Sequence, residues 1–212
     1  MLGSMTLADE LIFGQKPPAG LRLSYEEFLE TEFDHNHYEW VDGEVVEMNA
    51  IDDVQARVQI WILRLLADYV EAKDLGEVFV DPFQMKTGPD LPGRQPDIQF
   101  IAKDRLHLIQ RKCMRGPCDL AMEVVSYGSR KTDRVVKFGE YEQGGVREYW
   151  VVDPLRGAVE HFHLANGRFG PGEIDEEGRM LSHVLPGVWF MKDWFFDRPA
   201  KADILKQWGI GA

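Results

Sequence analysis

The sequence predicts an α/β protein with a central mixed β-sheet flanked by helices, and three consecutive segments carry that prediction. Leu120 to Ser126 is an apolar run broken by one acid, which is typical of a mostly buried strand. Thr132 to Tyr141 has apolar residues at helical spacing, with Thr132 as the expected cap, and Glu148 to Val152 is the next strand pattern. Strand, helix and strand in this order form a right-handed crossover, so the two strands are expected to be parallel neighbours.

The composition indicates a single domain. With 212 residues and 44% hydrophobic content, the chain can bury one substantial core. We expect a weakly structured lead over residues 1–20, one domain over 21–198 and a C-terminal tail over 199–212. The net charge of -12, from 24 Lys and Arg against 36 Asp and Glu, argues against a protein that coats nucleic acid through bulk charge. A local basic patch is still compatible with this charge.

The cysteine count and the hydropathy pattern argue against a zinc protein, a secreted disulfide-bonded protein and a membrane protein. Cys113 and Cys118 are too few for a zinc site, and without a secretory signal we expect reduced thiols in a cytoplasmic protein. No apolar run approaches the roughly 18 residues that suggest a membrane-spanning helix. We therefore expect no membrane association.

The N-terminal part predicts a short helix and a hairpin. Ser24 followed by Glu27 has the spacing of a capping box, which would open a helix to about Phe33. Tyr38 to Met48 contains two short strand patterns around Asp42-Gly43, a strong signal for a tight hairpin turn.

The middle of the chain predicts a long helix and two strands. Asp52 or Asp53 is the expected cap of the longest helix, which runs to about Ala72 and should lie on the sheet. Gly76 to Thr87 has a strand pattern interrupted by proline, which places it near an edge or a bulge. Pro96 to Ile101 is the next strand pattern, opened by a proline where no donor to the ladder is needed.

The C-terminal part predicts a hairpin and an aromatic segment. Ala158 to Leu164 and Gly167 to Ile174 have the patterns of two strands joined by a short turn. Met180 to Val184 is a further strand pattern, and the aromatic segment Trp189 to Phe196 follows it.

Two acids are the main candidates for chemistry. Asp97 begins one predicted strand and Glu123 lies in the middle of another, and strand alternation allows both side chains to meet if these strands pair. Carboxylates about 4 Å apart repel by roughly 1 to 4 kcal/mol, so the pair needs a shared proton or a divalent cation. Oxygen ligands suit Mg2+ or Mn2+, which can activate water and neutralise charge on a phosphate. Lys137, on the following helix, is placed to add positive charge beside that phosphate.

Other interpretations of these residues remain open. Asp97 alone would suit a turn cap, and Glu123 would suit a buried ion pair with Lys137 or Arg134. Arg130 and Arg134 belong to the densest basic segment, on the same helical face as Lys137, where a phosphate backbone can dock. The alternative for this segment is a solvated face balanced by nearby acids.

Two groups of histidines are weaker candidates. Asp34 to His37 contains the letters of a nuclease motif without that motif's spacing, so a polar loop is the better interpretation. His161 and His163 fall on one strand face, but without a third ligand in view we expect an exposed face and no metal site.

Several of these segments together resemble a known family. They are Pro96-Asp97, Glu123 to Ser126, Thr132, Asp133, Lys137, Tyr141, the hairpin sequence Y-E-W-V-D-G-E-V-V-E-M and the run G-V-R-E-Y-W-V-V-D-P from Gly145 to Pro154. From about Leu23 to Trp189, the chain resembles the Uma2-like restriction endonuclease domain family of the PD-(D/E)XK nuclease superfamily. The run ending at Pro154 is the most specific part of this resemblance.

The resemblance implies a restriction-endonuclease-like fold and a metal-dependent endonuclease that hydrolyses DNA. Asp97 and Glu123 would hold Mg2+ or Mn2+ with help from the Val124 carbonyl, and Glu44 would add a third acid from the hairpin. Lys137 would stand near the scissile phosphate. Cutting both strands needs two such sites, so we expect a homodimer, with the late hairpin and the aromatic segment as candidate interface surfaces.

The chain departs from the family pattern at two positions. The superfamily's lysine normally lies two residues after the acid, where this chain has Val125, so its role is expected to pass to Lys137. Gln55 stands where relatives often have a histidine. The alternatives are a catalytically inactive domain used for binding or assembly, and a nuclease for RNA or branched DNA.

Overall fold

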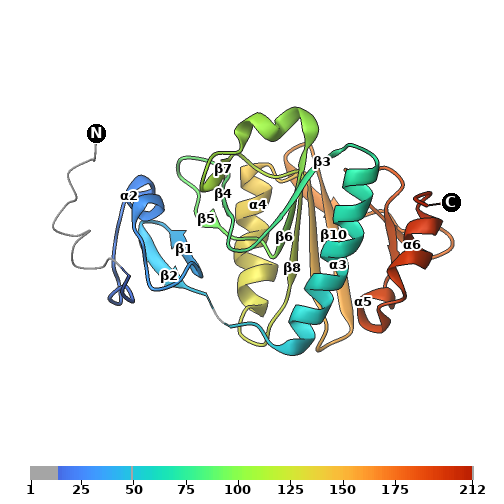
Figure 1. Ribbon diagram of the computed structural model, residues 1–212, viewed down its shortest axis with the longest axis horizontal. Helices are drawn as coiled ribbons and strands as arrows, with labels where there is room; N and C mark the ends of the chain where they lie inside the picture. The colour runs from blue at the N-terminus through green and yellow to red at the C-terminus, as the bar shows by residue number, and fades with distance from the viewer. Residues whose placement is uncertain (1–13, 49, 212) are drawn as a thin grey trace.

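The main body of the protein is a six-stranded mixed sheet, seen in a computed structural model that describes residues 14–48 and 50–211 (Figure 1). The strand order is β11-β10-β9-β8-β6-β3. In chain order these strands are β3 (Gly76–Val80), β6 (Ile98–Ala102), β8 (Leu120–Val124), β9 (Glu148–Asp153), β10 (Ala158–Ala165) and β11 (Arg168–Pro171). The predicted α/β class with a mixed sheet between helices is confirmed.

The centre of this sheet is the predicted crossover. β8 pairs in parallel with β9, and every residue of both strands is buried. β6 pairs antiparallel with β8, with Ile98 opposite Met122. The same register, carried one residue further, brings Asp97 to the position opposite Glu123.

Helices cover both faces of the sheet. On one face lie α3 (Asp53–Ala72), α5 (Trp194–Asp197) and α6 (Lys201–Gln207), and Ile62 and Leu66 of α3 share a core cluster with Phe100 and Trp150 of the strands. On the other face lies α4 (Phe138–Gly144), whose Tyr141 packs in a cluster with Tyr149. Figure 1 shows α3 and α4 on opposite sides of β6 and β8. The predicted long helix is confirmed, with the Asp52 side chain accepting from the Gln55 N–H at 2.8 Å.

A second, smaller sheet has the order β2-β1-β5-β4-β7. Its strands are β1 (Tyr38–Val41), β2 (Glu44–Glu47), β4 (Gln84–Lys86), β5 (Gly93–Arg94) and β7 (Cys113–Arg115). The β1–β2 hairpin turns at Asp42 and Gly43, both with positive φ, as the Asp-Gly pair predicts. Helix α2 (Tyr25–Glu30) begins with the predicted Ser24–Glu27 capping box. Figure 1 shows α2 and the hairpin beside the main sheet, joined to α3 by the segment after β2.

Two predicted elements differ in the structure. The Gly76 to Thr87 segment divides at Asp81-Pro82, so that β3 becomes an edge of the main sheet while β4 joins the second sheet. The predicted helix after β8 does not start with a Thr132 cap: a π-helix, η2 (Thr132–Lys137), runs directly into α4, and no side chain caps it. Turns of π-helix are rare and occur frequently at functional sites.

The C-terminal region contributes to the core. The predicted hairpin forms as β10 and β11, and β12 (Arg179–Leu181) pairs with β13 (Trp189–Met191). Phe190 and Phe195 of the aromatic segment are buried, which leaves less of that segment for a dimer interface. Ile204, Leu205 and Trp208 of the predicted tail are also buried, packed on α3.

A short 3-10 helix, η1 (Lys103–Leu108), connects β6 to β7.

Two further expectations concern the N-terminal lead and the membrane. Residues 1–13 of the predicted lead lie outside the described residues. Among residues 14–48 and 50–211, no helix is both long and apolar enough to cross a membrane.

Candidate active site

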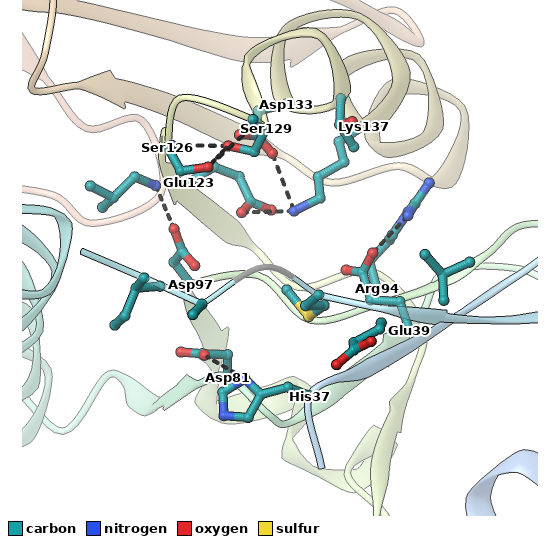
Figure 2. A pocket seen from close by; sticks show the side chains of 18 of the residues that line it. His37, Glu39, Asp81, Arg94, Asp97, Glu123, Ser126, Ser129, Asp133 and Lys137 are labelled. Carbon is teal, nitrogen blue, oxygen red and sulfur yellow. Dashed lines mark hydrogen bonds and ion pairs between the residues drawn. The ribbon is translucent and has the colours of Figure 1, made fainter. Parts of the chain in front are cut away.

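A cavity of about 880 Å³ lies between the β1–β2 hairpin, the adjacent ends of β6 and β8, and the π-helix. Six carboxylates line it: Glu39, Glu47, Asp81, Asp97, Glu123 and Asp133. Figure 2 shows Glu123, Asp133 and Lys137 in one group, Asp97 next to them, and Asp81 with His37 on the opposite side. The predicted acids and the predicted lysine therefore meet in one cavity.

The two predicted acids are buried and held by specific partners. Asp97 Oδ2 accepts a hydrogen bond from the Val124 N–H at 2.6 Å, across the β6–β8 pair. Glu123 Oε1 accepts from the Tyr141 hydroxyl at 2.8 Å, and its Oε2 lies 2.9 Å from Lys137 Nζ. Both carboxylates line the cavity, as strand alternation predicts.

The π-helix turns two charged residues inward. Lys137 Nζ lies 3.3 Å from Asp133 Oδ1 as well as contacting Glu123, and all three side chains are buried. The predicted alternative, an ion pair between Glu123 and Lys137, is thus present in the structure. The two carboxylates fix the position of the Lys137 ammonium group and favour its protonated form.

Burial shifts the protonation of these groups. It raises the pKa of Asp97 to about 7, against the lowering effect of Lys137 and of the Val124 N–H. Burial also raises the pKa of Glu123 well above its ordinary value, and the neighbouring charges of Asp97 and Asp133 add to it. For Lys137, burial acts to lower the pKa, but the surrounding carboxylates, led by Glu123, outweigh it and raise the pKa.

The oxygen atoms around Asp97 and Glu123 suit a hard divalent cation. The Val124 carbonyl is close to both acids in the chain and accepts from Gln55 Nε2 at 2.6 Å. Gln55 Oε1 is buried and has no hydrogen-bond partner within the described residues, so it is an orphaned acceptor at the cavity. Carboxylate, carbonyl and amide oxygens are the ligands that Mg2+ and Mn2+ accept, usually with several waters retained.

The protein alone supplies few side-chain ligands. In the described part of the chain, no group of three or more His, Cys, Asp and Glu side chains is arranged to hold a metal. A cation at Asp97 and Glu123 would therefore depend on the backbone carbonyl and on water for the rest of its coordination. That pattern is common for Mg2+, which keeps water ligands.

An ion network fixes the hairpin wall of the cavity. Arg94 of β5 contacts Glu39 of β1 at 2.7 Å and Glu140 of α4 at 2.7 Å, and the Gln95 N–H donates to Glu39 at 2.9 Å. Arg94 and Glu39 are both buried. The network joins the second sheet to α4, and so it sets the distance between the hairpin and the carboxylates.

Glu39 and Asp133 line the cavity but were not predicted as site residues from the sequence. Glu39 shares a strand face with Val41, so an acid on an otherwise apolar face of the hairpin was the available signal. Asp133 lies four residues before Lys137, a spacing at which opposite charges pair on a helix.

Three predicted site residues lie outside the cavity lining. Glu44 is exposed at the start of β2. Arg130 is paired with Asp153 at 3.2 Å, and Arg134 with Asp153 at 3.0 Å and Glu160 at 2.6 Å. These pairs match the predicted alternative of a basic face balanced by acids. Neither arginine is paired with Asp97 or Glu123.

The histidines divide between the cavity and the core. The 34–37 segment is a loop, as predicted, and its His35 and His37 line the cavity, where His37 Nδ1 lies 3.9 Å from Asp81. The expectation of an exposed strand face is wrong for His161, which is buried against Trp150 with ring centroids 4.4 Å apart.

Comparison with known proteins identifies a family that the chain matches and a solved structure with a similar fold. The model of the Uma2 family, described as "Putative restriction endonuclease", matches residues 25–193. A crystal structure described as a "putative nuclease belonging to DUF820" from Anabaena variabilis is similar in fold, with a TM-score of 0.66 and 14% sequence identity, over 85% of this chain and 98% of that one. No curated protein matches the chain.

Proposed function

This chain belongs to the Uma2 family, and on that premise we propose that it is a metal-dependent endonuclease that hydrolyses phosphodiester bonds in DNA. The observation that carries the proposal is the meeting of Asp97, Glu123 and Lys137 in one cavity. The three residues come from β6, β8 and the π-helix, so the fold itself brings them together.

Each residue has a role that follows from its surroundings. Asp97, Glu123 and the Val124 carbonyl would hold Mg2+ or Mn2+, which when bound supplies positive charge and activates water. Lys137 stays protonated among its carboxylates and donates to a phosphoryl oxygen, where negative charge grows during hydrolysis. Tyr141 holds Glu123, and Asp133 holds Lys137, so both groups are positioned before any ligand binds.

A second candidate function is a binding or assembly module without catalysis. The contact that favours it is the 2.9 Å ion pair between Glu123 and Lys137, which compensates the buried acid without any metal. In that case the cavity would be a preserved structural feature, and its acids would bind no cation.

A plasmid-nicking assay with Mg2+ or Mn2+ separates the two candidates. We expect the wild type to nick supercoiled DNA, and Asp97→Asn and Glu123→Gln to lose at least about 100-fold in rate because each removes an anionic ligand of the metal that activates water. Glu77→Gln, at an exposed position of β3, is the matched control and should keep wild-type activity. The same four proteins are also tested on single-stranded circular DNA. Equal rates in all four proteins, or no metal-dependent cleavage of either form of DNA by the wild type, would reject the proposal in favour of the module.

A further inference from the structure

The cavity lining combines charged and aliphatic residues. Beside its carboxylates, histidines and Lys137, it contains a group of aliphatic side chains from the hairpin, the segment after it and the π-helix, called here the aliphatic wall. The aliphatic residues of this wall are Val41, Val46, Met48, Ala50, Ile51 and Val136. Val46 and Ile51 are 38% and 46% exposed, so this apolar surface is open to a ligand.

The cavity lacks the cations that a DNA duplex needs. Arg94 and Lys137 are the only arginine and lysine among the described lining residues, and both are already paired with carboxylates. Nearby Arg130 and Arg134 are paired with acids as well. Proteins bind duplexes through rows of cationic contacts to both phosphate backbones. Single-strand sites also use cationic grooves but add base stacking, which needs no charge, so a nucleic acid bound here would depend more on stacking and apolar contact than on cations.

The volume of the cavity is that of a pocket for a small ligand. Pockets that enclose small ligands measure about 300–1,000 Å³, and this one measures about 880 Å³. A nucleotide taken out of a base stack has an apolar face and a phosphate, and the cavity lining contains both aliphatic side chains and the proposed metal-binding acids.

An exposed aromatic residue stands at the mouth. Tyr127 is 83% exposed and lies between Ser126 and Gly128, both of which line the cavity. The guanidinium of Arg130 lies 5.5 Å from the centre of its ring. Aromatic side chains presented in this way stack on the bases of single strands, and neighbouring arginines add to that contact.

We propose that the substrate of this site is single-stranded DNA. One base would lie against the aliphatic wall, a neighbouring base would stack on Tyr127, and the phosphate between them would reach Asp97 and Glu123. This inference rests on the proposed function, because it names the form of DNA that the same carboxylates would hydrolyse.

The test compares binding of the full chain to a fluorescent single-stranded oligonucleotide and to the same sequence in a blunt duplex. Anisotropy is measured with Ca2+, which fills oxygen sites, and a gel checks that the DNA stays intact. We expect the single strand to bind at least about tenfold more tightly than the duplex. Val136→Ser and Tyr127→Ala should each weaken single-strand binding by at least about threefold, since each removes apolar contact.

Val135→Ser is the matched control. Val135 is the neighbour of Val136 on the same π-helix and is 62% exposed, but it does not line the cavity, so its substitution should leave binding unchanged. Equal affinity for both forms of DNA, including no measurable binding of either, would overturn the inference, as would a loss in Val135→Ser equal to that in Val136→Ser.

The binding assay tests the form of DNA that is bound, and the nicking assay tests the proposed function, so each proposal can be rejected without the other. A protein that cuts DNA but binds duplex and single strand equally keeps its proposed function and loses this inference. A protein that binds single strands selectively but cuts no DNA under any metal loses the proposed function.

Discussion

Lys137 is the residue on which the charge balance of the site depends. Its ammonium group lies within 3.3 Å of both Asp133 and Glu123, and all three side chains are shielded from water. These contacts compensate the buried charges in the empty protein, and under the proposed function the same ammonium group would also donate to a phosphoryl oxygen. Removing the lysine tests the first of these roles directly.

Lys137→Met should destabilise the fold by about 3 kcal/mol at pH 8, because it leaves a buried acid without its partner. The double variant Lys137→Met/Glu123→Gln should recover much of that loss, since no buried charge is then left at position 123. Urea unfolding of the wild type, Lys137→Met, Glu123→Gln and the double variant measures the coupling. Losses that simply add would show that the two side chains do not stabilise each other.

His161 provides a pH test away from the site. Burial lowers its pKa from 6.5 to about 4, so above pH 6.5 the ring is neutral in both the folded and the unfolded chain. As the pH falls from 6.5 to 4, the unfolded chain takes up a proton that the folded protein does not, and stability falls by roughly 2–3 kcal/mol before levelling off.

Unfolding free energies measured from pH 7.5 to 4 should therefore drop more steeply in the wild type than in His161→Gln. The difference between the two proteins isolates His161 from the buried carboxylates, which titrate in both. Parallel pH profiles would contradict a buried neutral His161.

At the scale of elements, the π-helix is the feature that places the site's lysine. A π-helical turn contains an extra residue relative to a regular α-helix, and here it carries both Asp133 and Lys137 inward. The crossover that contains it was predictable, because the apolar run of β8 and the glycines after α4 are local signals. The π-helix was not, since its sequence has the apolar spacing of an ordinary helix.

Deleting Val135 should restore regular helical geometry and turn Lys137 away from Glu123. We expect nicking to fall by about 100-fold, because a displacement of about 1 Å at a reacting group costs that much. Circular dichroism should show that the helix and the fold persist, and Val135→Ala should behave as the wild type. Full activity in the deletion variant would exclude a positioning role for the π-helix.

At the scale of the whole molecule, the cavity exists because two sheets meet. The main sheet supplies Asp97 and Glu123, whereas the hairpin of the second sheet supplies Glu39 and the aliphatic wall, and Arg94 ties them together. Strand alternation and the family resemblance were enough to predict that the two acids and the lysine lie together. They did not predict the Arg94–Glu39–Glu140 network, because its members are far apart in the chain and each has the local pattern of an ordinary surface charge.

The positions of Arg130, Arg134 and Glu44 show the same limit. Helical spacing indicated that the arginines form a surface for phosphate, and the family resemblance implied that Glu44 is a third ligand. Partners on β9 and β10 hold the arginines, and the hairpin leaves Glu44 exposed. Which face a charged residue presents is decided by neighbours that only the folded chain brings near.

Calorimetric titration with Mn2+ tests the central claim most directly, namely that Asp97 and Glu123 hold a divalent cation. The account predicts one saturable site in the wild type that Asp97→Asn and Glu123→Gln abolish and that Glu77→Gln preserves. Binding that survives both substitutions, or a wild type that binds no Mn2+, would contradict it.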